Sequence, residues 1–158
     1  MKRMRLGSAA AIAAGTLAAT GLAFAPTAAA VTPQTATISA TCSLIGSGVA
    51  TLTATQTGTA ATITVSSTEI TTPIGLGEDS VAATLTLVKA SGGTTVFSGT
   101  ENPAIPAGGG VTVGPLTGTV APGDSLEAFG GSLQLSVLGI PITCTASAAQ
   151  SPSPFVFE

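Results

Sequence analysis

The stretch Thr35-Ala-Thr-Ile-Ser-Ala-Thr-Cys42 decides the fold class, because its apolar and hydroxylated residues alternate strictly. Successive side chains of a β-strand point to opposite faces. One face of this stretch therefore carries Ala36, Ile38, Ala40 and Cys42, and the other carries only threonine and serine. The pattern predicts a strand with one buried face and one face in water.

Similar alternation recurs along the chain and predicts an all-β fold. It is clear in residues 49–56, 61–67, 81–89 and 132–138, and weaker in 94–98, 111–120 and 126–129. Glycine-rich turn signals, such as Ser91-Gly-Gly93 and Gly130-Gly131, separate the segments. About seven to nine short strands with turns at this interval predict an antiparallel β-sandwich of two sheets. Low-complexity disorder is the alternative, and the fixed spacing disfavours it.

Residues 1–30 have the three parts of a secretory signal peptide. Lys2, Arg3 and Arg5 form a basic start, an apolar stretch covers residues 8–25, and Ala28-Ala-Ala30 supplies the small residues of a cleavage site. An N-terminal membrane anchor is the alternative, but the apolar run is at the short end for a bilayer span.

Removal of residues 1–30 would leave a β-sandwich domain at 31–150 and a C-terminal tail at 151–158. We expect this product to be secreted into the extracellular space, with association to the cell wall left open. No insertion into a membrane is expected after processing.

Charge excludes one class of partner. Beyond residue 30 the chain carries a single basic residue, Lys89, against seven acidic ones. Neutralised phosphates supply most of the non-specific affinity for nucleic acids, and one cation cannot neutralise a row of them. We therefore expect no nucleic-acid partner.

The two cysteines are predicted to form a disulfide. Cys42 lies on the apolar face of its strand, and Cys144 shares a face with Ile140 and Ile142. Two inward-facing thiols in an exported chain predict the bond Cys42–Cys144, which ties the first strand to the last. Two buried free thiols are the alternative. Neither cysteine has a second Cys or a His nearby, so we expect no metal site there.

Several short features together resemble a known group of proteins. The basic, Ala-rich leader, the Thr/Ala-rich strands, Thr41-Cys-Ser-Leu44 and Pro141-Ile-Thr-Cys-Thr145 are similar to exported immunoglobulin-like β-sandwich proteins of actinobacteria, most of them uncharacterised. The resemblance spans the chain after the leader and implies an immunoglobulin-like sandwich. No functional residue can be carried over from it.

The residue inventory argues against an enzyme. The chain has no His, Tyr or Trp, so an ordinary triad base is missing. Gly123-Asp-Ser-Leu126 spells the nucleophile block of the GDSL esterases, but those enzymes need a partner His. We expect no catalytic residue, no cofactor and no activity at Ser125.

Two acidic pairs could in principle hold a cation or act on glycosides. They are Glu78 with Asp79, and Asp124 with Glu127. The spacing of these residues matches no known calcium loop, so we expect them to lie in turns exposed to water. Calcium binding by these acidic loops is left open.

Two functions remain. The first is a non-enzymatic structural or surface-interaction protein, whose Thr-rich faces or strand edges contact the cell wall, a protein partner or copies of the chain itself. The alternative is a binding module for a small apolar metabolite, with a pocket lined by loop residues. The candidate loop residues are Ile70, Pro73, Ile74, Leu76, Ile105 and Pro106.

Overall fold

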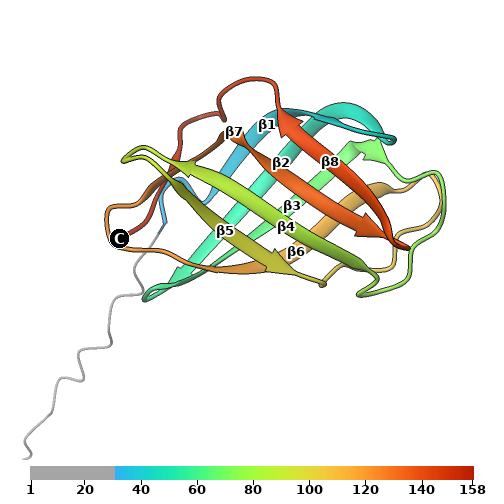
Figure 1. Cartoon of the computed structure of the whole chain (residues 1–158), viewed down its shortest axis with the longest axis horizontal. Helices are drawn as coiled ribbons and strands as arrows, with labels where there is room; N and C mark the ends of the chain where they lie inside the picture. Colours follow the sequence, from blue (N-terminus) through green and yellow to red (C-terminus); the bar gives the residue numbers. More distant parts are fainter. Residues whose placement is uncertain (1–30) are drawn as a thin grey trace, which may run out of the picture.

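The computed structural model describes residues 31–158, which form nine β-strands that pair antiparallel throughout (Figure 1). The strands are β1 Thr35–Cys42, β2 Gly46–Thr57, β3 Ala60–Thr71, β4 Val81–Lys89, β5 Thr94–Gly99, β6 Gly110–Thr119, β7 Ser125–Val137, β8 Ile140–Ala146 and β9 Phe155–Val156. The all-β prediction is therefore confirmed. Within this range no helix is long and apolar enough to cross a membrane.

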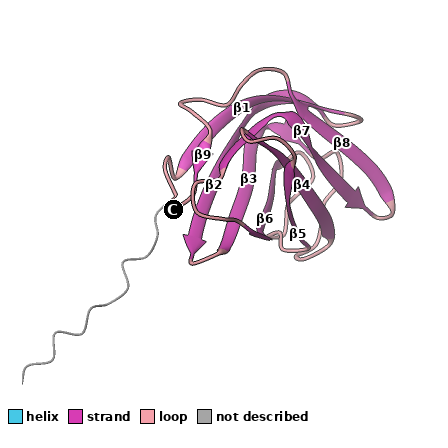
Figure 2. Cartoon of the chain, turned by 60° about the vertical axis from the view of Figure 1, so that its left-hand side comes forward, coloured by secondary structure: helices cyan, strands magenta, loops and turns pink. Residues whose placement is uncertain are grey.

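The first eight strands form a closed barrel, so the predicted two-sheet, immunoglobulin-like sandwich is wrong (Figure 2). Hydrogen bonds run in the order β4-β5-β6-β3-β2-β1-β8-β7, and β7 then pairs with β4. The closing pair runs from Val81 opposite Val137 to Lys89 opposite Leu126. The sheets of a sandwich have edge strands that are unpaired on one side, whereas here each of the eight strands is bonded on both sides.

Alternation along each strand separates the inside of the barrel from the outside. In β2, Leu52 and Ala54 are buried while Thr53 and Thr55 are exposed. Neighbouring strands align their threonines on the outer wall, and the Oγ1 atoms of Thr55 and Thr62 lie 2.6 Å apart. The Thr-rich faces predicted from sequence thus form the outer surface, and the apolar faces form a common core.

β7 is a single long strand, where the sequence predicted two strands and a turn at Gly130-Gly131. The register between β4 and β7 shifts between Thr86 and Val88, opposite these glycines. A Cβ on Gly131 would collide with the Thr86 carbonyl oxygen. The glycines therefore form a β-bulge, which bends the strand without ending it.

The C-terminal residues cover one end of the barrel, at the left in Figure 1. In the segment 151–158, expected as a tail, β9 pairs with the start of β7. Phe155 and Phe157 are fully buried, and the side chain of Gln56 donates to the backbone oxygen of Glu158. This end of the barrel is closed by two aromatic rings and a hydrogen-bonded backbone.

The Cys42–Cys144 disulfide is confirmed. The two residues are directly opposite each other on β1 and β8. Both lie on the buried faces of their strands, so their sulfur atoms meet inside the barrel. The bond is compatible with an extracellular location. The predicted signal peptide, residues 1–30, lies outside the described residues.

Candidate functional site

The other end of the barrel, at the right in Figure 1, contains an apolar cavity of about 140 Å³. Its walls come from the β1–β2 and β7–β8 turns, the β3–β4 and β5–β6 loops, and the adjoining strand ends. Thr72 is the single polar residue in the lining. The lining residues are Leu44, Ile45, Thr72, Pro73, Ile74, Leu76, Val81, Ile105, Val111, Val113, Leu135, Val137, Leu138, Ile140 and Ile142.

Four large apolar side chains at this end are exposed to solvent. Leu44, Ile74, Leu138 and Ile140 all line the cavity, and each is exposed at its outer edge. We call these four residues the apolar rim. Grouped exposure of large apolar residues around a hollow is typical of a contact or ligand-binding surface.

Two rim residues have an unfavourable backbone. Leu44 has φ of 70° and Leu138 has φ of 50°, in the left-handed region that costs most L-residues free energy. Leu138 and Gly139 form a two-residue hairpin loop between the paired residues Val137 and Ile140. Two-residue hairpin loops favour the sequence Asn-Gly. Leucine at position 138 therefore makes the folded protein less stable than asparagine would.

The two long loops at the mouth are bonded to each other. Leu76 and Ile105 exchange backbone hydrogen bonds of 2.8 and 2.9 Å. Buried Asn102 accepts from the Val81 N–H at 2.9 Å and donates to the Gly77 oxygen at 2.8 Å. These bonds fix the loops, so the cavity walls are preformed.

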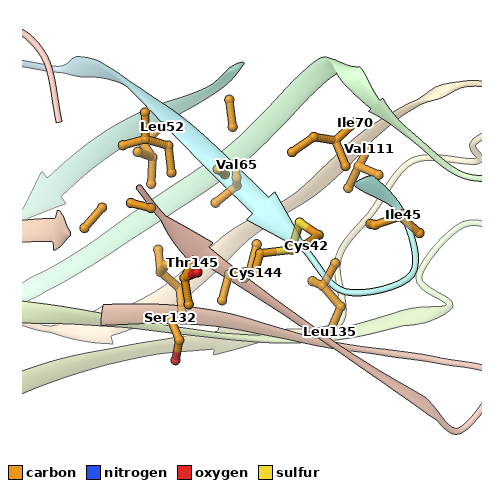
Figure 3. Close-up of a pocket in the computed structure, with 17 residues that line it drawn as sticks. Cys42, Ile45, Leu52, Val65, Ile70, Val111, Ser132, Leu135, Cys144 and Thr145 are labelled. Carbon is orange, nitrogen blue, oxygen red and sulfur yellow. A yellow bond between two sulfur atoms is a disulfide. The ribbon is translucent and has the colours of Figure 1, made fainter. Parts of the chain in front are cut away.

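A smaller apolar cavity of about 40 Å³ lies deeper in the barrel, beside the disulfide. Figure 3 shows the Cys42–Cys144 bond among side chains from β2, β3, β6 and β7. Ile45, Val111 and Leu135 line both cavities. The deeper space thus shares a wall with the mouth cavity.

Most of the loop residues named from sequence surround these spaces. Pro73, Ile74, Leu76 and Ile105 line the mouth cavity. Ile70 lies in β3, not in a loop, and lines the deeper cavity. Pro106 lines neither. The turn residues of the cavity, above all Leu44 and Leu138, were not predicted from the sequence. For Leu138 the available signal was a leucine directly before a glycine in a tight turn.

The acidic residues near Ser125 support local structure. Asp124 forms an ion pair with Lys89, with Nζ 3.0 Å from Oδ2, and accepts from the Ala121 N–H at 2.9 Å. The Ala121 hydrogen bond, and then Lys89, lower the pKa of Asp124 below its ordinary value, while burial opposes the shift. The carboxylate is therefore used in closing the β6–β7 turn.

The remaining acidic candidates are placed separately. Glu127 accepts from the N–H groups of Phe129 and Gln150, at 3.1 and 2.9 Å. Glu78 and Asp79 are exposed in the β3–β4 loop. Among residues 31–158, no three His, Cys, Asp or Glu side chains are grouped as a metal site.

In comparisons with known proteins, no family model, no curated protein and no solved structure matches the chain.

Proposed function

We propose that the protein is a secreted, non-enzymatic binding module for a small apolar molecule, which it holds in the mouth cavity. The observation that carries the proposal is the joint placement of a preformed apolar cavity and an exposed apolar rim at the same end of the barrel. An eight-stranded barrel is just wide enough to be filled by side chains or to hold one small ligand.

Size and polarity limit the ligand. A volume of about 140 Å³ is close to that of engineered apolar cavities that bind benzene. A charged group would lose its hydration against these walls without replacement. The ligand class is therefore a neutral molecule of about the size of a single aromatic ring, with any longer part extending past the rim.

The test is a titration with benzene, followed by NMR of the Leu, Val and Ile methyl groups. Saturable shifts are expected for Leu135, Val137 and Ile142, which line the cavity. The methyl groups of Val96 and Val156, exposed on the outer surface, are expected to stay unchanged. Shifts that stay linear with concentration at every methyl group would overturn the proposal.

A matched pair of variants locates the site. Val137→Phe places a ring in the cavity wall and is expected to abolish saturable binding. Val96→Phe adds the same ring to the exposed face of β5 and is expected to leave binding unchanged. Amide NMR spectra of both variants establish that the barrel is intact.

A surface-interaction protein is the second candidate, and the apolar rim favours it. Copies that meet rim to rim would cover Leu44 and Leu138, the most exposed large apolar residues of the described chain. Sedimentation at rising protein concentration tests this: a dimer that dissociates in Leu44→Ser would support association through the rim. The eight barrel strands are paired on both sides, so pairing through a free strand edge is disfavoured.

A further inference from the structure

Thr72 is a buried hydroxyl without a partner in the wall of the mouth cavity. Its residue is 6 % exposed, and its Oγ1 has no hydrogen-bond partner among the described residues. Buried polar atoms are nearly always paired, because an unpaired one loses its hydration without compensation. An unpaired hydroxyl in a cavity wall can hydrogen-bond a ligand that enters the cavity.

The backbone of Thr72 is held firmly in place. Its N–H donates to the Gly109 oxygen at 3.0 Å, and its carbonyl accepts from the Gly108 N–H at 2.7 Å. These two bonds join the β3–β4 loop to the β5–β6 loop. The side chain therefore keeps its position at the cavity wall, and rotation about χ1 moves Oγ1 among the staggered positions.

We propose that Thr72 is the specificity-determining residue of the cavity, and that the ligand is a small apolar molecule with one neutral hydrogen-bonding oxygen. This inference rests on the proposed function. A threonine hydroxyl both donates and accepts, so an alcohol, a phenol or a ketone fits it. All other lining residues are apolar, so a second polar group on the buried part of the ligand would have no side-chain partner there.

The chain supplies a matched control in Thr95. This residue is 5 % exposed, and its Oγ1 likewise has no partner within residues 31–158. It lies on β5 and lines neither the mouth cavity nor the deeper one. Thr95→Val and Thr72→Val each remove a similarly buried hydroxyl group. Only Thr72→Val changes the wall of the mouth cavity.

The experiment compares phenol with benzene, which differ by one hydroxyl. Dissociation constants are measured by methyl NMR for the wild type, Thr72→Val, Thr72→Ser and Thr95→Val. Thr72→Val is expected to weaken phenol binding about tenfold and to change benzene binding less than about twofold. Thr72→Ser keeps the hydroxyl and is expected to retain the preference for phenol, as is Thr95→Val.

The outcomes separate this inference from the function on which it rests. If both probes bind and their affinity ratio is unchanged in Thr72→Val, the role of Thr72 is overturned and the binding function stands. If neither probe gives saturable shifts in the wild type, both fail. An independent reading is the nuclear Overhauser effect between phenol and the Thr72 methyl group, expected in the wild type; its absence at saturating phenol would also overturn the role of Thr72.

Discussion

Leu44 and Leu138 lie at the tips of two different turns, both with a positive φ, and both line the mouth of the same cavity. They are 75 % and 74 % exposed. A leucine that is both exposed and in the left-handed region contributes little to folding, and strained residues of this kind cluster at functional sites. Their joint position supports a role for the apolar rim in contact with a ligand or partner.

Leu138→Asn is expected to stabilise the protein and to weaken ligand binding. Asparagine tolerates the left-handed region and completes the Asn-Gly hairpin loop, so the free energy of unfolding should rise by about 1 kcal/mol. Loss of the apolar contact at the mouth should reduce benzene affinity. Urea unfolding and methyl NMR measure the two effects.

The control for this variant is Ile140→Asn, which removes another rim residue from an ordinary strand backbone. It should weaken binding without raising stability. An unchanged or lower stability of Leu138→Asn would contradict the strain argument.

Removing the disulfide is expected to cost much of the stability of the barrel. Cys42 and Cys144 are separated by 102 residues, and a loop of this length corresponds to about 4–5 kcal/mol in the chain-entropy model. The double variant Cys42→Ala/Cys144→Ala should lose that amount in urea unfolding. Reductant should destabilise the wild type and leave the variant unchanged. A native protein whose thiols react with a thiol reagent before unfolding would disprove the bond.

Acid is expected to weaken the contribution of Asp124. Its pKa in the folded state is lowered, first by the Ala121 N–H and then by Lys89, so the folded state favours the carboxylate. The stability gained is fully present above the ordinary pKa near 3.8 and is lost as pH falls through the lowered folded value.

The measurement for Asp124 is unfolding at a series of pH values for the wild type and Asp124→Asn. The stability advantage of the wild type should be constant from about pH 7 to 5 and shrink below about pH 4. An advantage that does not change with pH would show that charge plays no part. Glu78→Gln, in an exposed loop, is the control for a general loss of acidic charge.

The C-terminal segment is expected to be essential to stability. Phe157 is fully buried, whereas the neighbouring residue Val156 is exposed. Phe157→Ala should cost about 3–5 kcal/mol, and Val156→Ala less than about 1 kcal/mol. Thermal unfolding compares the two. Equal, small effects would mean that residues 151–158 are a dispensable tail.

Local pattern was sufficient to find the strands but not their arrangement. β1 and β4 begin and end where alternation predicted, at Thr35–Cys42 and Val81–Lys89, because burial of one face depends on period two alone. A barrel and a sandwich both bury one face of each strand. The pairing of β4 with β7 decides between them, and that register is set by contacts distant in sequence.

The residues of the candidate site also divide into those that local sequence predicted and those that depend on contacts distant in sequence. Pro73, Ile74, Leu76 and Ile105 were predicted because apolar residues of loops at one end of a β-fold can line a pocket. Leu44 and Leu138 were not predicted, because their positive φ and exposure depend on turns whose geometry the sequence does not show. The partnerless hydroxyl of Thr72 depends on the arrangement of two loops, and no single segment contains that information.

The pairing of β1 with β8 means that the barrel cannot close until β8 has been synthesised. At about 5–20 residues per second, a ribosome needs about 5–20 s to make the 102 residues between Cys42 and Cys144. During that interval the apolar faces of β1 to β6 have no completed barrel to enter. Closure then depends on long-range pairing, which is intrinsically slow. The apolar faces are therefore most open to aggregation before the barrel closes, while the polypeptide is still incomplete.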